Sequence, residues 1–391
     1  MGKGNCLSIF EKEVDTYKIN IKLIIMNQIG LMEDELILKQ YYSRYGGYWR
    51  FPEMLDYCYL VNPYFNRSAI IKEMQDFFPV LVSEYPSGMG VNSSLAAECW
   101  NIKQERIVVG NGAAELIKAL MENLKGKVGV VRPTFEEYPN RMPAEQVETF
   151  VPKNDMFRYD ADDLIEYFGA HKVESLLLIN PDNPSGNFIP VERIHKLAQW
   201  CEDNDVFFIL DESFVDFSVG YETNTFLNNK ILEKYPHMAV MKSISKSYGV
   251  PGLRLGILCS ADESLIVKMK KQVSIWNINS FAEFFMQIYP KYRQDYKRAC
   301  NQFIKAREDF EVELKKIPYL KVMPSQANYF FLEVLPPYKP LELCGILLKK
   351  YNILASACLA KKGIESNRYM RIAVRNHGDN EKFIKALKEL I

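Results

Sequence analysis

Ser243-Ile244-Ser245-Lys246-Ser247-Tyr248-Gly249-Val250-Pro251-Gly252-Leu253-Arg254-Leu255-Gly256 is a short loop with one lysine among small and hydroxyl residues. A strand-like apolar run at residues 238–241 leads into the loop, and a second run at residues 255–259 leads out of it. A lysine between two buried strands is poorly placed for a solvated surface charge. We expect Lys246 to be desolvated, and a desolvated lysine loses its proton easily and can attack a carbonyl group to form a Schiff base.

Three further side chains of this loop suit a phosphate group. Ser243 and Ser245 supply hydroxyls, and Arg254 supplies a guanidinium fork, which together can bind phosphate oxygens. A Schiff-base lysine, Lys246, beside a phosphate site indicates pyridoxal 5'-phosphate (PLP) as the cofactor. The competing interpretation is an ordinary turn with a stray lysine, and the partners described below argue against it.

The composition excludes several other classes of protein. The chain has 391 residues, of which 48% are hydrophobic, enough for a large core and two domains. Lysine plus arginine and aspartate plus glutamate both number 49, so neither nucleic acid nor an anionic membrane is expected as a partner. Eight cysteines without a C-x-x-C pair and four histidines indicate neither a metal site nor a disulfide framework. Reduced thiols fit a cytoplasmic protein, and no apolar run is long enough to span a membrane.

Strands and helices alternate through the middle of the chain. Apolar runs separated by amphipathic stretches occur at residues 106–109, 128–131, 175–179 and 206–210. Such runs predict mostly parallel strands covered by helices on both faces, which is an α/β fold. In such a sheet the ligand lies at the carboxyl ends of the strands. Asp211 and the loop that carries Lys246 both follow strands, so one sheet edge could bring them together.

A glycine turn comes before one of the predicted helices. Gly110-Asn111-Gly112-Ala113-Ala114 follows a short apolar run. Small residues at a helix start expose backbone N–H groups and the positive end of the helix dipole, which is a general anion site. The spacing is not a dinucleotide fingerprint. We expect Gly112, Ala113 and Ala114 to form a second clamp on the phosphate.

Two residues ahead of the lysine loop suit the ring of PLP. Asn180-Pro181-Asp182-Asn183-Pro184-Ser185-Gly186 is a proline-punctuated loop that presents the Asn183 amide. Asp211 follows a buried strand, so its carboxylate needs a partner. A pyridinium N–H is a suitable one, and the protonated ring then draws electrons from a carbanion. Alone, Asp211 could equally be a helix cap or part of a salt bridge, but its place between Asn183 and Lys246 favours the cofactor role.

The last hundred residues differ from the middle of the chain, because helices and short strands follow a finished α/β run. We expect an N-terminal arm at residues 1–30 and the N-terminal part of a small lobe at 31–75. A large PLP-binding domain is expected at 76–285, and a smaller α+β C-terminal domain at 286–391.

These motifs together resemble fold-type I PLP-dependent enzymes of the class I/II aminotransferase family. Within it they resemble the branch of histidinol-phosphate aminotransferases and threonine-phosphate decarboxylases. The resemblance covers roughly residues 40–391, and its motifs stand at residues 180–186, 211–212, 243–256, 324–328 and 370–374. It implies the PLP-dependent transferase fold, with a mostly parallel mixed sheet covered by helices.

The resemblance also implies a role for each cofactor residue. Lys246 would carry PLP and shuttle protons, Asp211 would pair with the pyridine nitrogen, and Asn183 would reach the 3' oxygen. Phe135 would stack on the ring. The phosphate would be held by small, hydroxyl and cationic residues of the two turns, namely Gly112, Ala113, Ala114, Ser243, Ser245 and Arg254.

Three other residues would bind substrate or join two subunits. Arg371 would hold the α-carboxylate of the substrate as a bidentate fork, and Gly47 would lie near the same carboxylate, with Asn183 beside the substrate. Tyr85 matches a tyrosine that reaches the phosphate of the neighbouring subunit, which implies a homodimer.

Phe214 departs from the pattern of many aminotransferases. A tyrosine often stands three residues after the aspartate and donates to the 3' oxygen, which Phe214 cannot do. Residues 211–217 and the Tyr45-Gly46-Gly47 stretch instead resemble the threonine-phosphate decarboxylase branch. The departure leaves the reaction type open, while the cofactor assignment stands.

We expect transamination between a small amino acid, which could bear a phosphate or phosphonate, and a 2-oxo acid. The alternative is amino-acid decarboxylation on the same scaffold. A PLP-binding regulator without catalytic activity is disfavoured, because the leader has no helix-turn-helix pattern and no basic stripe. Arg375, Arg368 and Lys361 could bind a distal anion of the substrate, or could be solvated surface charges.

Overall fold

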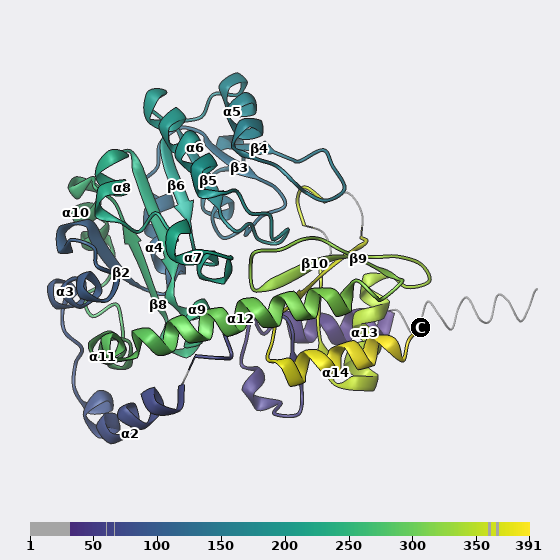
Figure 1. Ribbon diagram of the computed structural model, residues 1–391. Coiled ribbons are helices and arrows are strands. Elements are labelled where there is room, and N and C mark those ends of the chain that lie inside the picture. Colours follow the sequence, from purple (N-terminus) through teal and green to yellow (C-terminus); the bar gives the residue numbers. More distant parts are fainter. Residues whose placement is uncertain (1–31, 60, 66, 359–360, 365–366) are drawn as a thin grey trace, which may run out of the picture.

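The computed structural model describes residues 32–391 except 60, 66, 359–360 and 365–366 (Figure 1). The expected arm at residues 1–30 lies outside the described residues. The described part contains three sheets of seven, four and two strands, with helices packed around them. Within it, no helix is both long enough and apolar enough to cross a membrane, and no cluster of side chains is suited to hold a metal ion.

The seven-stranded sheet forms the centre of the larger part. Its strands are β2 (Ile107–Asn111), β3 (Val128–Val131), β4 (Val147–Phe150), β5 (Ser175–Ile179), β6 (Phe207–Asp211), β7 (Met238–Ser243) and β8 (Leu255–Cys259). Their order is β2-β8-β7-β6-β5-β3-β4. The strands from β7 to β4 are parallel neighbours, whereas β8 is antiparallel to both β2 and β7. The predicted mostly parallel mixed sheet is therefore confirmed.

Helices cover both faces of this sheet. They are α3 (Met89–Trp100), α4 (Ala113–Met121), α5 (Ala161–Ala170), α6 (Val191–Asp203), α7 (Tyr221–Asn224), α8 (Asn229–Lys234), α9 (Ile244–Ser247), α10 (Glu263–Gln272) and α11 (Ser280–Ile288). Successive strand side chains point to opposite faces. In β5, accordingly, Leu177 and Ile179 join one core while Leu176 and Leu178 join the other. A strand apolar on both faces can be buried only in this way.

The smaller part is built on an antiparallel sheet of order β12-β13-β10-β9. Its strands are β9 (Leu320–Val322), β10 (Tyr329–Val334), β12 (Ser356–Ala357) and β13 (Tyr369–Ala373), packed with α13 (Pro340–Tyr351) and α14 (His377–Lys388). A two-stranded parallel sheet joins β1 (Leu55–Asp56) to β11 (Ile353–Leu354). Residues 32–42 form a further helix, and α2 (Arg67–Ser83) follows β1 in the chain.

Short 3-10 turns connect many of these elements. They are η1 (Tyr48–Arg50), η2 (Gln104–Arg106), η3 (Pro139–Arg141), η4 (Ala144–Gln146), η5 (Val215–Phe217), η6 (Pro251–Leu253) and η7 (Tyr289–Tyr292). After η7 the chain continues as α12 (Arg293–Leu314), which runs along both parts of the molecule (Figure 1). In α12, Phe303 packs on Phe217 of η5 and Phe310 packs on Phe330 of β10.

The proposed domain boundaries fall inside two helices. The boundary after residue 75 lies within α2, and the boundary after residue 285 lies within α11. A helix is held together by hydrogen bonds between residues four apart, so a division inside one would break it. The two-domain division stays a proposal, and its boundaries would have to move to the ends of these helices.

Candidate active site

Lys246 lies in the single turn of α9, directly after β7. The backbone N–H of Asn62 donates to its carbonyl oxygen at 2.9 Å. No described residue forms a hydrogen bond or ion pair with its amine. Burial lowers the pKa of Lys246 to about 8, and the positive charges of Arg371 and Arg254 add to this. Near neutral pH an amine with this pKa is unprotonated, and so able to act as a nucleophile, in a far larger fraction than an ordinary lysine.

Lys242, four residues earlier, is a buried lysine whose charge is neutralised by an ion pair. Its Nζ lies 2.7 Å from Asp216 Oδ1, and both side chains are buried. The Ser247 hydroxyl donates to the other carboxylate oxygen of Asp216 at 2.7 Å. A buried lysine normally needs such a partner. Lys246 lacks one, and this difference points to a reactive role for it.

Asp211 ends β6 and is only 4% exposed. The backbone N–H of Ser213 donates to its Oδ1 and the hydroxyl of Tyr138 donates to its Oδ2, both at 2.8 Å. Burial raises the pKa of Asp211, while these hydrogen bonds act in the opposite direction. The carboxylate is therefore held in a fixed orientation, and it carries no ion pair with any described lysine or arginine at contact distance.

Tyr138 is a site residue that the sequence analysis missed. It lies in the segment after β3 that also carries Phe135, and its side chain is fully buried. Its position three residues after Phe135 could have marked it as a site residue. The sequence pattern does not indicate that its partner is Asp211. The contact depends on how the segment after β3 passes over the end of β6.

Asn183 and Arg371 are brought together from distant parts of the chain. Arg371, on β13, donates from Nη1 to Asn183 Oδ1 at 2.8 Å and from Nη2 to the Cys58 carbonyl at 3.2 Å. Its guanidinium carbon lies 5.4 Å from the centre of the Tyr329 ring. Its Nε is buried and has no hydrogen-bond partner, so the guanidinium still has a donor to offer a ligand.

The loop of Asn183 is held in place by hydrogen bonds on both sides. The Asn180 side chain exchanges two hydrogen bonds with the backbone of Ile189, at 3.0 and 2.8 Å. The Tyr329 hydroxyl donates to the Asp182 carbonyl at 2.6 Å. These contacts hold the loop against β10 of the smaller sheet.

The two predicted phosphate turns lie against each other. Gly112 begins α4 with φ of 75°, a conformation that favours glycine. A Cβ at this position would overlap the guanidinium of Arg254, and a Cβ at Gly256 would overlap the backbone of Gly112 and Ala113. Both glycines are therefore needed for the close approach, which places Arg254 beside the N-terminus of α4.

Ser245 Oγ is buried and has no hydrogen-bond partner among the described residues. Ser243, also buried, has its N–H bonded to Ser213 Oγ at 3.0 Å, next to the Asp211 turn. An unpaired buried hydroxyl is costly, and it is explained if a ligand completes its hydrogen bonding. Ala113 and Ala114 add the free N–H groups of the first turn of α4.

Phe135, Tyr85 and Gly47 are not joined to these clusters by hydrogen bonds or ring contacts within the described part of the chain. Phe135 is partly exposed. Tyr85 is 78% exposed and stacks on Trp276, with ring centres 4.5 Å apart. Gly47 has φ of 73° and precedes Tyr48, whose ring meets that of Tyr59 at 5.4 Å. Tyr59 follows Cys58, so Gly47 lies on the Arg371 side of the molecule.

Comparison with known proteins now identifies the group to which this arrangement belongs. Residues 92–388 match the family model Aminotransferase class I and II. The chain belongs to this family. An L-serine phosphate decarboxylase from Sulfurospirillum multivorans is 30% identical over 348 residues, which cover 86% of this chain and 88% of that protein. A solved decarboxylase structure from the same organism matches with a TM-score of 0.79 and 29% identity, over 88% of this chain and 90% of that chain.

A third relative is longer than this chain. A CMP-5'-(3-aminopropyl)phosphonate synthase from Streptomyces rubellomurinus is 30% identical over 349 residues, which are 89% of this chain but 55% of that protein. The chain spans about half the length of two of its curated relatives, the synthase included. Other relatives include threonine-phosphate decarboxylases and histidinol-phosphate aminotransferases, the branch that the motifs resemble.

PLP is the cofactor of class I/II aminotransferases and therefore of this chain, and the residues described above fit it. The unpaired Ser245 hydroxyl and the Arg254 guanidinium, packed against Gly112 at the N-terminus of α4, suit the phosphate. The unpaired amine of Lys246 suits the aldehyde carbon, and the buried carboxylate of Asp211 suits the pyridine nitrogen.

Phe214 is a buried residue of this aminotransferase-family site. Its ring meets the Tyr329 ring edge to face, with centres 5.2 Å apart. The hydroxyl that many family members place here is absent, and Phe214 serves to pack Tyr329, which in turn lies under Arg371.

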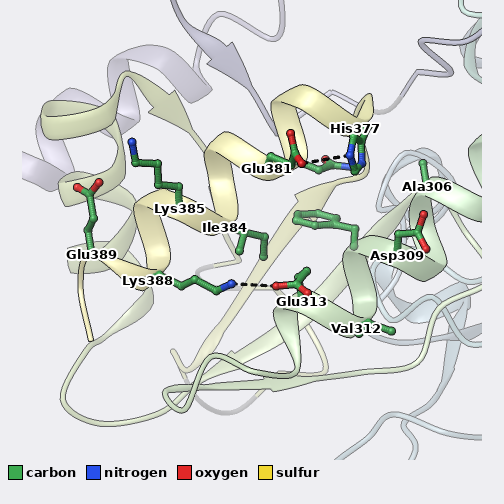
Figure 2. A pocket seen from close by; sticks show the side chains of 12 residues that line it. Ala306, Asp309, Val312, Glu313, His377, Glu381, Ile384, Lys385, Lys388 and Glu389 are labelled. Carbon is green, nitrogen blue, oxygen red and sulfur yellow. Dashed lines mark hydrogen bonds and ion pairs between the residues drawn. The ribbon is translucent and has the colours of Figure 1, made fainter.

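A separate surface groove of about 680 Å³ lies between α12 and α14, away from these residues (Figure 2). Figure 2 shows two pairs among its polar side chains: Lys388 with Glu313 at 2.9 Å, and His377 with Glu381 at 3.1 Å. None of the predicted site residues lines it. We do not assign the family's chemistry to this groove.

Proposed function

We propose that this chain is a PLP-dependent decarboxylase that acts on a small amino acid bearing a phosphate or phosphonate. The observation that carries the proposal is the similarity to L-serine phosphate decarboxylase, at 30% identity over most of both chains. The synthase relative supports the substrate class, because a 3-aminopropyl phosphonate carries an amine and a phosphonate but no carboxylate.

From the sequence we expected transamination, but the similarity to L-serine phosphate decarboxylase favours the alternative, amino-acid decarboxylation. Histidinol-phosphate aminotransferases are also among the relatives, at 27% identity for one from Methanococcus maripaludis. Phe214 is consistent with the decarboxylase branch, since it removes a hydrogen bond that many aminotransferases use. A 2-oxo acid partner is accordingly not part of the proposal.

Bound PLP supplies an electron sink for the negative charge that develops at the α-carbon. In our proposal the Lys246 amine would hold the cofactor covalently and would move a proton at the α-carbon. The Asp211 carboxylate, oriented by Tyr138 and Ser213, keeps the pyridine nitrogen protonated. Loss of carbon dioxide leaves an electron pair at the α-carbon, and one proton taken up at that atom, delivered by Lys246, completes the amine product.

The reaction type depends on which substrate group Arg371 holds. The bond that breaks at the α-carbon is the one held perpendicular to the cofactor ring. An arginine that grips the carboxylate in the ring plane favours removal of the α-hydrogen and hence transamination. We propose that Arg371 here would bind the distal anion instead of the α-carboxylate predicted from the motif, which would leave the α-carboxylate without this anchor and able to depart as carbon dioxide.

A homodimer with shared sites is a further part of the proposal, supported by exposed aromatic side chains near Tyr85. Trp276, Phe77 and Phe78 are about half exposed, and the two phenylalanines pack on residues of α11. Exposed apolar patches of this kind mark interfaces. Sedimentation of the holoenzyme should give a dimer, and a fully active monomer would contradict this part. A cytoplasmic location also stays a prediction.

The test of the reaction is a product assay on the purified holoenzyme with O-phospho-L-serine, O-phospho-L-threonine and L-serine, each with and without 2-oxoglutarate. We expect carbon dioxide and the corresponding amine, with no dependence on 2-oxoglutarate. Formation of a 2-oxo acid from the amino acid, with glutamate as co-product, would show that the chain is an aminotransferase. The Lys246→Ala variant gives the background for both products.

A further inference from the structure

Three cations could bind a distal anion of the substrate, and they differ in the groups with which they already interact. Arg375 donates to Asp379 Oδ2 at 2.9 Å and to the Asp56 carbonyl at 2.8 Å. Arg368 lies 3.1 Å from Glu333 and its side chain is 62% exposed. Lys361 differs from both, because its amine donates to a neutral group, the Thr134 carbonyl, at 2.9 Å.

The position of Lys361 puts it at the active site. It follows β12, and Ser356 of β12 pairs directly with Arg371 of β13. Thr134, which accepts its hydrogen bond, immediately precedes Phe135 in the segment after β3. The side chain of Lys361 therefore reaches from the smaller sheet to the segment expected over the cofactor ring. Close packing of this loop is also seen at Gly363, where a Cβ would contact the backbone of Arg132 and Pro133.

The charges around Lys361 leave room for an anion. Burial lowers its pKa, and the charge of Arg371 lowers it further, while Cys358, Glu136 and Asp182 act in the opposite direction. Glu136 already pairs with Arg132 at 3.2 Å. Asp182 accepts hydrogen bonds from Ser185, and burial raises its pKa to about 6. Neither carboxylate forms an ion pair with Lys361 at contact distance.

Two cations near one site suit a group with two negative charges. A carboxylate carries one charge, which a single guanidinium can satisfy in bidentate fashion. A phosphate monoester carries between 1.5 and 2 negative charges near pH 7, roughly, and three acceptor oxygens. Its third oxygen and extra charge call for a second donor. Lys361 can supply one, because its charge interacts with that of Arg371 and its hydrogen bond goes to a neutral carbonyl.

We propose that Lys361 binds the distal phosphate or phosphonate of the substrate together with Arg371, and so determines specificity for phosphorylated amino acids. This inference rests on the proposed function for its choice of substrate. Substrate binding would exchange the Thr134 carbonyl, a neutral acceptor, for an anionic one, which forms a stronger hydrogen bond with an ammonium group.

The test measures binding and turnover for O-phospho-L-serine and L-serine in three variants. Lys361→Met removes the charge, and Lys361→Gln removes the charge but keeps a donor for the Thr134 carbonyl. The control is Lys362→Met, at an exposed neighbouring lysine. We expect both Lys361 variants to bind O-phospho-L-serine at least ~10-fold more weakly by titration calorimetry, with L-serine binding unchanged and the control like wild type.

Two outcomes would overturn the inference. If Lys361→Gln bound O-phospho-L-serine as well as wild type, the lysine charge would have no role in phosphate binding. If both ligands weakened equally, Lys361 would only hold the Thr134 segment in place. Because binding is measured apart from turnover, wild-type protein that binds O-phospho-L-serine through Lys361 but releases no carbon dioxide would contradict the proposed function alone.

Discussion

The proposed cofactor region and the proposed substrate region of this molecule are built in different ways. The cofactor region comprises residues 112–114, Asp211 and residues 243–256, all at one edge of the seven-stranded sheet. The substrate region comprises Cys58, Asn183, Lys361 and Arg371, which come from four separate segments. In the first region each residue lies at the end of a strand of one sheet or in the turn next to that end. In the second, only tertiary packing between the two parts of the molecule brings the residues together.

The difference shows which site residues can be predicted from local sequence and which depend on tertiary packing. A strand end places its next residue at a known edge, so local sequence suffices to predict the cofactor residues. The substrate residues depend on how the smaller sheet docks on the larger part. Changes in the two regions should accordingly have separable effects, on cofactor chemistry in one case and on substrate recognition in the other.

The largest effect is expected from Lys246→Ala in the cofactor region. Loss of the nucleophile and proton carrier should lower kcat by ~10⁴-fold or more. In wild-type protein, borohydride reduction followed by peptide mapping should find the cofactor attached to Lys246. The ion-paired Lys242 is the internal control and should stay unlabelled. A label on any other lysine would overturn the assignment.

Asp211→Ala should lower kcat by ~10³-fold while weakening PLP binding less, because the phosphate turns remain intact. Tyr138→Phe keeps the carboxylate but removes one of its hydrogen bonds, so a loss of only ~10-fold is expected. The measurements are kcat and the PLP dissociation constant. If Asp211→Ala kept near-normal turnover, the carboxylate would not act on the pyridine nitrogen.

In the substrate region, Arg371→Ala should lower kcat/KM for the phosphorylated amino acid by ~10² to 10³-fold, through loss of charge-assisted hydrogen bonds. The absorption of the bound cofactor and the PLP content should stay as in wild type. A lower kcat/KM with an unchanged PLP content would show that Arg371 acts on the substrate and not on the cofactor. A variant that lost its PLP along with its activity would show that Arg371 supports the cofactor region as well, and would break the comparison.

The smallest effect concerns stability and the charge on Lys246. Burial lowers its pKa from 10.5 to about 8, so between these values the unfolded state of the cofactor-free protein binds more protons than the folded state. Stability therefore rises with pH across this window. Below pH 8 both states are charged and the cost of burying the ammonium is fully present. Lys246→Met removes that cost and should stabilise the cofactor-free protein at pH 7 by about 2 kcal/mol.

Urea unfolding of the cofactor-free proteins at pH 7 and pH 10 measures this effect. The gain from Lys246→Met should shrink as the pH rises toward 10.5. Lys242→Met is the matched control, and it should destabilise at both pH values because it leaves Asp216 buried without its partner. An equal gain from Lys246→Met at both pH values would indicate better packing rather than removal of a charge.

The α/β fold with its mixed sheet could be predicted from the sequence because its strands are continuous apolar runs between helices. PLP could be predicted because Lys246 lies in a loop of small residues behind a strand. Tyr138 could not, since its contact with Asp211 depends on the path of the segment after β3. The role of Lys361 also stayed open, because only the docked loop reveals that its hydrogen bond goes to the Thr134 carbonyl while Arg375 and Arg368 face carboxylates.

The hydrogen bond from Asn62 to the Lys246 carbonyl bears on how the chain is completed during synthesis. The segment of Asn62 includes β1, whose strand partner is β11 at residues 353–354. The two strands lie far apart in the chain, so β11 leaves the ribosome long after β1. Contacts this distant in sequence form late. All strands of the seven-stranded sheet precede β11 in the chain, so they have been synthesised before the pairing of β1 with β11 can fix the segment of Asn62 against the Lys246 turn.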